Sequence, residues 1–80
     1  MEHIGIKVLA FGMIAEKIEA TEFYLQHIKT TDEFMEYLTE KYPQLQGMKF
    51  TLSLNKNIIN KNTAISEGSV VALLPPFSGG

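Results

Sequence analysis

Cysteine, tryptophan and arginine are all missing from this chain of 80 residues. Without cysteine there is no disulfide framework, no thiolate nucleophile and no cysteine-ligated zinc or iron–sulfur site. A fold of this size buries only about 60% of the surface that its unfolded chain exposes, so packing alone must hold one modest core together. We therefore expect a single domain over residues 1–80, too small to enclose the active site of a two-lobed enzyme.

A strong excess of charge is absent too. Seven basic residues, all of them lysine, and nine acidic residues leave a formal net charge of -2. Because arginine supplies the planar fork that binds phosphate and guanine, and no basic stripe replaces it, no nucleic-acid partner is expected. His3 and His27 have no spacing to a carboxylate pair that would indicate a metal ligand or a general base. Neither a metal site nor a permanently bound cofactor is predicted.

Long hydrophobic runs are also lacking. The longest apolar stretch, residues 70–77, contains two prolines and is far shorter than the roughly 20 residues that cross a bilayer. The first residues include Glu2 and Lys7 and lack the apolar segment of a secretory signal. We expect a cytoplasmic protein with no membrane partner.

Apolar periodicity predicts about five strands. Residues 4–11 place apolar side chains at alternate positions and add Leu9 and Phe11 on the opposite face, which indicates a strand covered on both faces towards its end. Residues 70–74 form a continuous apolar run, which is typical of a strand buried on both faces. Strands with a polar face are predicted over residues 21–28 and 50–54, and a short one, whose pairing stays open, over residues 58–59.

One main helix is predicted between the second and third strands. Thr30 and Glu33 have capping-box spacing, in which the hydroxyl and the carboxylate bond to backbone N–H groups at the helix start. Apolar side chains then recur at intervals of three or four residues, at Phe34, Tyr37, Leu38 and Tyr42. Pro43 ends the helix, because the residue before a proline is disfavoured in helical conformation. A shorter helical turn is expected over residues 14–18.

This order of elements predicts an α+β fold with a mixed sheet of about five strands. The two most apolar strands, the first and the last, belong side by side in the centre, where the main helix lies across one face. A chain that returns its last strand to the middle and projects its end from the sheet has the ubiquitin-like β-grasp plan. We therefore expect residues 75–80 to form a flexible functional tail.

The tail has the sequence Pro75-Pro76-Phe77-Ser78-Gly79-Gly80. Proline has no N–H for a strand ladder and a fixed φ, so the pair stops strand pairing and stiffens the exit. Six extended residues reach roughly 20 Å, enough to thread a terminal carboxylate into a partner's cleft, and glycine carries no Cβ that a narrow channel would exclude. A Gly-Gly end taken alone favours a frayed terminus, whereas the apolar strand and the Pro-Pro exit before it favour a functional tail.

The chemistry open to such a tail is that of its carboxylate, which is ionised at neutral pH and is a poor electrophile. The carboxylate becomes reactive when a partner converts it to a mixed anhydride with a nucleotide phosphate, which sulfide, a persulfide or an amine can attack. On this hypothesis the domain is a carrier and cosubstrate that needs no catalytic side chain of its own.

Four segments, residues 8–11, 54–55, 67–68 and 71–80, occur in the order seen in a known family. With them the chain resembles the MoaD type of ubiquitin-like sulfur carrier, the small subunit of molybdopterin synthase. The resemblance covers nearly the whole chain. Its most specific part is the ending, two apolar residues followed by Pro-Pro, an apolar residue, a small residue and Gly-Gly.

The resemblance implies a sequence of reactions at Gly80. A ubiquitin-activating-type adenylyltransferase would adenylate this glycine with ATP, and a sulfur donor would convert it to a thiocarboxylate. The large subunit of molybdopterin synthase would then take up the tail and pass the sulfur to cyclic pyranopterin phosphate, forming the molybdopterin dithiolene. The chain would be a non-catalytic subunit of a sulfurtransferase, usually a heterotetramer of two small and two large subunits.

The same resemblance places Ser78 and Gly79 in the partner's channel. Apolar residues around the exit are expected either in the core or in a docking surface, namely Phe11, Leu73, Leu74, Pro75, Pro76 and Phe77. Ala15 and the Leu73-Leu74 pair differ from the commoner family choices, which are arginine and aromatic residues respectively. These differences concern partner contacts and not the chemistry of the tail.

Two other functions stay open at this point. The first is a sulfur carrier for the thiamine thiazole or for tRNA thiolation, although the thiamine carrier is usually shorter and lacks the Pro-Pro-apolar exit. The second is a ubiquitin-like modifier conjugated to lysines, or a binding module with an inert tail. The acidic residues at 32, 33, 36 and 40 are expected on a solvated helix face rather than in a site.

Overall fold

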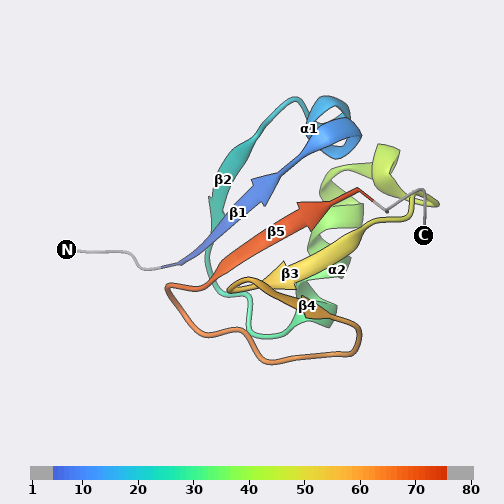
Figure 1. Cartoon of the computed structure of the whole chain (residues 1–80). Helices are drawn as coiled ribbons and strands as arrows, with labels where there is room; N and C mark the ends of the chain where they lie inside the picture. The colour runs from blue at the N-terminus through green and yellow to red at the C-terminus, as the bar shows by residue number, and fades with distance from the viewer. Residues whose placement is uncertain (1–4, 76–80) are drawn as a thin grey trace.

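A mixed sheet of five strands, in the order β2-β1-β5-β3-β4, forms the middle of the protein in a computed structural model that describes residues 5–75 (Figure 1). The strands are β1 (Ile6–Ala10), β2 (Glu22–Leu25), β3 (Thr51–Leu54), β4 (Asn57–Ile59) and β5 (Val70–Leu74). Strands β1 and β5 run parallel, and the other neighbouring pairs are antiparallel. Helix α1 (Gly12–Ile18) follows β1, and helix α2 (Thr31–Lys41) crosses one face of the sheet, behind it in Figure 1. The predicted α+β, β-grasp fold is confirmed.

The two central strands are the two most apolar ones, as predicted. Val8 lies opposite Val71, and Ala10 lies opposite Leu73. These four side chains are buried together with Phe34 of α2, and none of the five is more than 3% exposed. Since α2 covers this face, burial of apolar surface at about 25 cal/mol per Å² holds helix and sheet together.

Helix α2 begins where the capping pattern places it. The N-cap residue is Thr30, whose Oγ1 accepts a hydrogen bond from the N–H of Glu33 at 3.2 Å. The carboxylate of Glu33 reaches back one residue further than in a standard capping box and accepts from the N–H of Lys29 at 2.9 Å. Phe34 and Leu38 face the core, and the helix ends at Lys41, two residues before Pro43. Both ends of the predicted helix are correct to within one residue.

Two short elements around α2 exceed what the sequence predicts. Helix α1 has seven residues rather than one turn, although no side chain caps its start. Its stability therefore comes from Ile14 and Ile18, which are buried in the core. A 3-10 turn, Pro43–Leu45, follows α2 where the sequence predicts neither helix nor strand, and it buries Leu45 to 1% exposure. Among residues 5–75, no helix has both the length and the apolar character that a membrane span requires.

The edge strands differ from their predicted lengths. Strand β2 ends at Leu25 rather than at residue 28, because His27 adopts a left-handed backbone conformation with a φ of 69°. Strand β4 settles the open question about residues 58–59, since Ile58 pairs with Ser53 and Ile59 pairs with Leu52 of β3. These pairings make β4 one edge of the sheet and β2 the other.

A tight turn at Asn55 and Lys56 joins β3 to β4 and also anchors the start of β5. Both residues have positive φ, 49° and 74°, as in the type I′ turns of two-residue hairpins. The Asn55 side chain accepts from the N–H of Val70 at 2.9 Å and donates to Oγ of Ser69 at 3.3 Å. Its own N–H donates to the carbonyl of Val70 at 2.8 Å. One asparagine thus connects the hairpin to the strand that leads to the tail.

Substitutions in this turn should change stability in opposite directions. We expect Asn55→Gly, which keeps the turn conformation but loses the two side-chain hydrogen bonds, to lower the free energy of unfolding by about 1–2 kcal/mol. Lys56→Gly should raise it by a few tenths of a kcal/mol to about 1 kcal/mol, because glycine adopts positive φ without strain. Urea denaturation of both variants measures the two effects. Equal stabilities of Asn55→Gly and the wild type would show that the amide bonds contribute nothing.

Candidate functional site

The chain leaves the sheet at the end of β5, between the end of β1 and the start of β3. Leu74 lies opposite Thr51 of β3, and Leu73 lies opposite Ala10 of β1. The N–H of Phe11 donates to the carbonyl of Leu73 at 3.2 Å, which extends the contact between β1 and β5 by one residue. Pro75 is the last residue that the structure describes. The two residues before it are bonded to β1 on one side and paired with β3 on the other, so the position where the chain leaves the sheet is fixed from both sides.

The proposed site residues fall into two groups. Those of the tail, Pro76, Phe77, Ser78, Gly79 and Gly80, lie outside the described residues, as does His3. Of the others, Phe11 is 45% exposed, and Leu74 and Pro75 are half-buried. Leu73 is 0% exposed, because the alternation of β5 turns it towards α2. The sequence leaves Leu73 open between core and docking, and the structure assigns it to the core.

One prediction about the central strands is wrong. Residues 70–74 and the end of the first strand were expected to be covered on both faces, but α2 covers only one face of the sheet (Figure 1). On the other face, within residues 5–75, the apolar side chains stay partly exposed. We call this surface the open sheet face and define it by its apolar members, Leu9, Phe11, Val70, Ala72 and Leu74.

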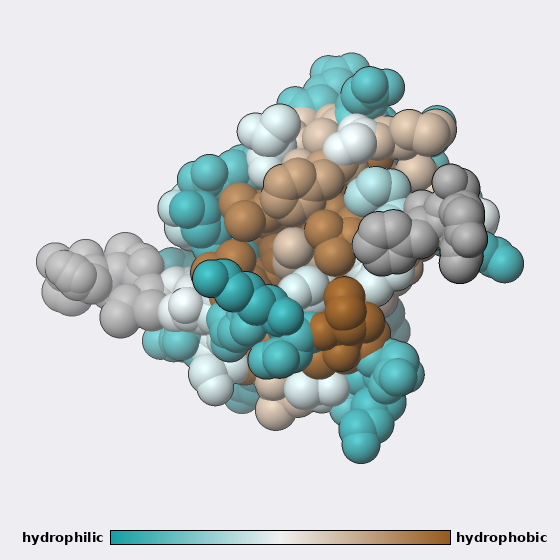
Figure 2. Space-filling view, in the orientation of Figure 1, coloured by the Kyte–Doolittle hydropathy of each residue, from teal (hydrophilic) through white to brown (hydrophobic). Residues whose placement is uncertain are grey.

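The open sheet face faces the viewer in Figure 2, where apolar residues gather over the middle of the sheet and hydrophilic residues surround them. A hollow of about 310 Å³ lies in it, lined by Leu9, Phe11, Ser53, Asn55, Lys56, Val70 and Ala72. The walls are largely apolar, and Lys56 brings a cation to the rim. Towards the β2 edge, Lys7 and Glu22 form an exposed ion pair at 3.8 Å. Such a surface fits an apolar projection of a partner protein.

Three members of the open sheet face, Leu9, Val70 and Ala72, were not predicted as docking residues from the sequence. A signal for them was present, since a chain with one main helix has nothing to cover the second apolar face of its central strands. Strands β1 and β5 carry more apolar residues than one covered face can bury, and this excess could have identified the surface from the sequence.

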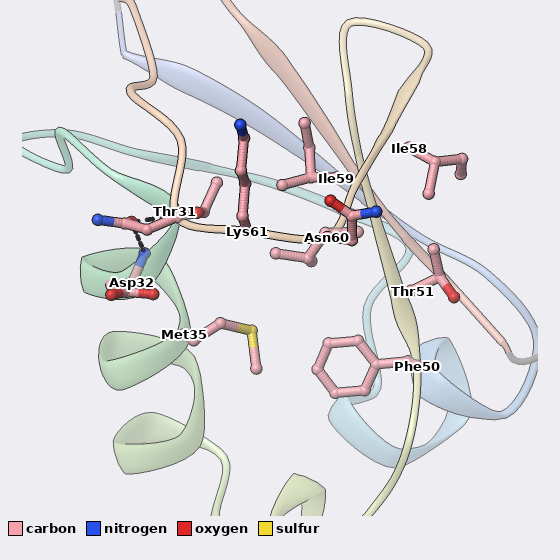
Figure 3. A pocket seen from close by; sticks show the side chains of 11 residues that line it. Thr31, Asp32, Met35, Phe50, Thr51, Ile58, Ile59, Asn60 and Lys61 are labelled. Carbon is pink, nitrogen blue, oxygen red and sulfur yellow. Dashed lines mark hydrogen bonds between the residues drawn. The ribbon is translucent and has the colours of Figure 1, made fainter.

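A second hollow, of about 440 Å³, lies between α2 and the β3–β4 hairpin (Figure 3). Met35, Phe50 and Ile59 contribute apolar side chains to its wall. The polar groups beside the start of α2, on the left in Figure 3, are bonded to one another: the carbonyl oxygen of the Asn62 side chain accepts from Oγ1 of Thr31 at 3.3 Å and from the N–H of Asp32 at 2.9 Å. These bonds attach the loop after β4 to the start of α2. We therefore interpret the hollow as a result of how this loop packs on α2, and not as a binding site.

A model of the ThiS family matches residues 8–80. The chain belongs to the ThiS family. Membership confirms the resemblance that the sequence predicts, at the level of the ubiquitin-like sulfur-carrier family that includes the ThiS and MoaD types.

Solved structures of similar proteins agree with the ThiS-family fold. One chain of a complex of subunits 1 and 2 of the molybdopterin-converting factor from Helicobacter pylori 26695 is 28% identical to this chain, with a TM-score of 0.70; the match covers 94% of this chain and 97% of that one. The small archaeal modifier protein 1 of Methanosarcina acetivorans is 26% identical, with a TM-score of 0.74 and coverage of 99% and 100%. A candidate molybdopterin converting factor, subunit 1, from Pyrococcus furiosus has a TM-score of 0.82 at 14% identity, with coverage of 94% and 100%, and shows the shared fold alone.

Within the ThiS-family fold, the open sheet face and the exit of β5 are continuous. Phe11 and Leu74 belong to the face and also flank the point where the chain leaves the sheet. A partner that covers the face would therefore meet the beginning of the tail. We take the open sheet face and the exit together as the candidate functional site.

Proposed function

We propose that this chain is the sulfur carrier subunit of a molybdopterin synthase. The observation that carries the proposal is the course of β5, which runs through the sheet centre beside an uncovered apolar face and continues at Pro75 into a Gly-Gly ending. The similarity to a chain of the Helicobacter pylori complex of molybdopterin-converting factor subunits supports this choice of pathway.

Activation of the carrier begins at the carboxylate of Gly80. A carboxylate oxygen attacks the α-phosphorus of ATP, the P–O bond to the β-phosphate breaks, and pyrophosphate leaves. Hydrosulfide then attacks the acyl carbon, a C–S bond forms, the C–O bond to AMP breaks, and the proton on sulfur passes to water. No electron is gained or lost, so a ubiquitin-activating-type adenylyltransferase, ATP and a sulfur donor suffice, and the carrier supplies only its terminus.

The large synthase subunit then binds the charged carrier through the open sheet face. Leu9, Val70 and Ala72 lose their remaining contact with water on docking, which provides affinity in a complex otherwise held by a narrow tail. Ser78 and Gly79 occupy the channel, and the thiocarboxylate of Gly80 reaches cyclic pyranopterin phosphate. A dithiolene contains two sulfur atoms, so two charged carriers each transfer one: the sulfur bonds to a carbon of the pterin side chain, water cleaves its bond to the acyl carbon of Gly80, and Gly80 returns as a carboxylate for the next cycle. Two carriers and two large subunits form the complete synthase.

A ubiquitin-like modifier is the second candidate function. It is favoured by the similarity to the small archaeal modifier protein 1, which is 26% identical over nearly the whole length of both chains. The activation step is shared with the carrier, but an amine of a target lysine replaces the sulfur nucleophile, so that an isopeptide bond forms. The fold and the open sheet face serve either function.

Intact-mass spectrometry of the protein isolated from its own cells separates the two functions. A carrier should show one oxygen replaced by sulfur, located by fragmentation at Gly80. A modifier should instead appear in branched peptides joined through a lysine side chain of another protein. An unmodified terminus in cells, and after incubation with ATP, sulfide and the cognate adenylyltransferase, would contradict both functions.

A further inference from the structure

Gly12, the first residue of α1, lies against the ring of Pro75. A Cβ added at Gly12 would stand 3.2 Å from Cγ of Pro75, 3.8 Å from its Cβ and 3.9 Å from its Cδ. A separation of 3.2 Å is tighter than an ordinary contact between carbon atoms, so any side chain at position 12 would push the proline ring away. Because glycine has no Cβ, the Pro75 ring can lie directly against position 12. We call this position of the ring its seat.

The backbone next to this seat is already fixed. The N–H of Phe11 bonds to the carbonyl of Leu73 at 3.2 Å, and Leu74 is paired with Thr51. Proline has one allowed range of φ, near -65°, and gives no hydrogen bond to the sheet. Once the ring is in place, ψ of Pro75 is the one torsion of this residue that is left to set where the next residue begins.

We infer that Gly12 is a positioning residue: the seat that it offers to the Pro75 ring sets the direction in which the chain leaves the sheet towards a partner's active site. The inference rests on the proposed function, because a carrier has to deliver Gly80 to the active site of a partner. A displaced ring moves the point from which the segment carrying Gly80 starts, while the exposed side chains of the open sheet face stay as they are. The seat thus acts on the delivery of the terminus and not on docking.

The simpler explanation is that Gly12 is present only for its backbone, which has a φ of 60°. Gly47 allows the two explanations to be separated. It also has a positive φ, 81°, but a Cβ added there would meet nothing within 4 Å. Alanine at either position strains the backbone by roughly 1 kcal/mol, and only alanine at position 12 meets Pro75.

The test compares Gly12→Ala with Gly47→Ala in the adenylation reaction. ATP–pyrophosphate exchange by the cognate adenylyltransferase is measured over a range of carrier concentrations. We expect Gly12→Ala to lower kcat roughly tenfold, since a misplacement of about 1 Å can cost a hundredfold and the ring must move by less. Its KM should stay within about twofold, because the substitution leaves every side chain of the open sheet face, the surface that we expect the adenylyltransferase to bind as well, unchanged. Gly47→Ala should match the wild type in both constants and lose about as much thermal stability as Gly12→Ala.

A double-mutant cycle ties the effect to the proline. In a Pro75→Ala background the ring is gone, so Gly12→Ala should cause almost no further loss of kcat. Additive losses would overturn the inference, as would equal kcat values for Gly12→Ala and Gly47→Ala. A nuclear Overhauser effect between the Gly12 Hα and the Pro75 ring protons should be seen in the wild type, and its absence would also overturn the inference.

The same experiments distinguish a failure of the proposed carrier function from a failure of the role assigned to Gly12. If the wild-type chain shows no exchange and no thiocarboxylate while the Overhauser contact is present, the carrier function is contradicted, and with it the role of the seat. If the wild type is active and Gly12→Ala is equally active, the carrier function stands and the seat has no role in it.

Discussion

Deletion of Gly80 should abolish thiocarboxylate formation and sulfur transfer, and so should the addition of one alanine after it. Deletion leaves the carboxylate of Gly79 as the terminus, one residue short of the position that the Gly80 carboxylate reaches. One added residue moves the terminal carboxylate by about 3.5 Å, far more than an active site tolerates. Thermal unfolding should hardly change, by less than about 4 °C, because the described sheet and core end at Leu74 and we expect the change to cost less than about 1 kcal/mol.

The control for this experiment adds the same alanine ahead of Met1, at the other end of the chain. This variant should accept sulfur like the wild type. Intact-mass spectrometry after incubation with ATP, sulfide and the adenylyltransferase measures the charged fraction, and calorimetry measures the melting temperature. Unimpaired charging of the shortened chain would contradict the assignment of Gly80, and a fall of the melting temperature by about 10 °C or more would show that the end of the chain is structural.

A carboxylate placed in the open sheet face should weaken binding to the large synthase subunit by about a hundredfold. Ala72 lies in the middle of this face, opposite Leu9 of β1 and Ser53 of β3. Ala72→Glu would place a carboxylate in the apolar part of the interface, at a cost of about 3 kcal/mol, and tenfold in Kd corresponds to about 1.4 kcal/mol. Titration calorimetry with the large subunit measures the change.

Ala64→Glu is the matched control, because it introduces the same side chain on another surface. Ala64 is exposed and lies in the loop beside α2, where it bridges Thr30. This variant should bind the large subunit as the wild type does. Circular dichroism and melting temperature must show that both variants are folded. Equal affinities of Ala72→Glu and the wild type would exclude the open sheet face from the interface.

The fold could be predicted from the sequence because its main elements carry strong local signals. Residues 70–74 and the segment before Phe11 are the two most apolar β-type runs, so their place in the centre of the sheet followed from burial alone. Thr30 and Glu33 mark the start of α2, and Pro43 marks its end. Each of these signals concerns residues that are close together in the chain.

Features that depend on tertiary contacts could not be predicted in the same way. Helix α1 has no side-chain cap, and its seven residues are held by the burial of Ile14 and Ile18. Leu45 enters the core from a segment whose glycine and polar residues indicate a loop. Strand β2 stops at Leu25, and His27 takes a left-handed conformation that its residue type does not predict.

The geometry of the candidate site was only partly predicted, and its chemistry stays a prediction. The sequence of residues 75–80 carries the hypothesis of a reactive terminus, and it remains a proposal. The apolar run of β5 led to a wrong expectation of burial on both faces, whereas its outer positions, Val70, Ala72 and Leu74, belong to the open sheet face. A continuous apolar strand can be buried on both faces within a monomer, or it can be buried on one face by the monomer and on the other by a partner. The sequence of the strand is the same in both cases.

Reconstitution of the complete reaction is the decisive experiment for the proposed sulfur transfer. The carrier, charged as the Gly80 thiocarboxylate, is mixed with the large synthase subunit and cyclic pyranopterin phosphate, and the dithiolene product is measured together with the state of the carrier terminus. We expect product in proportion to the sulfur supplied, with Gly80 returned as a carboxylate. No dithiolene, with the thiocarboxylate still intact in the presence of an active large subunit, would contradict the carrier function.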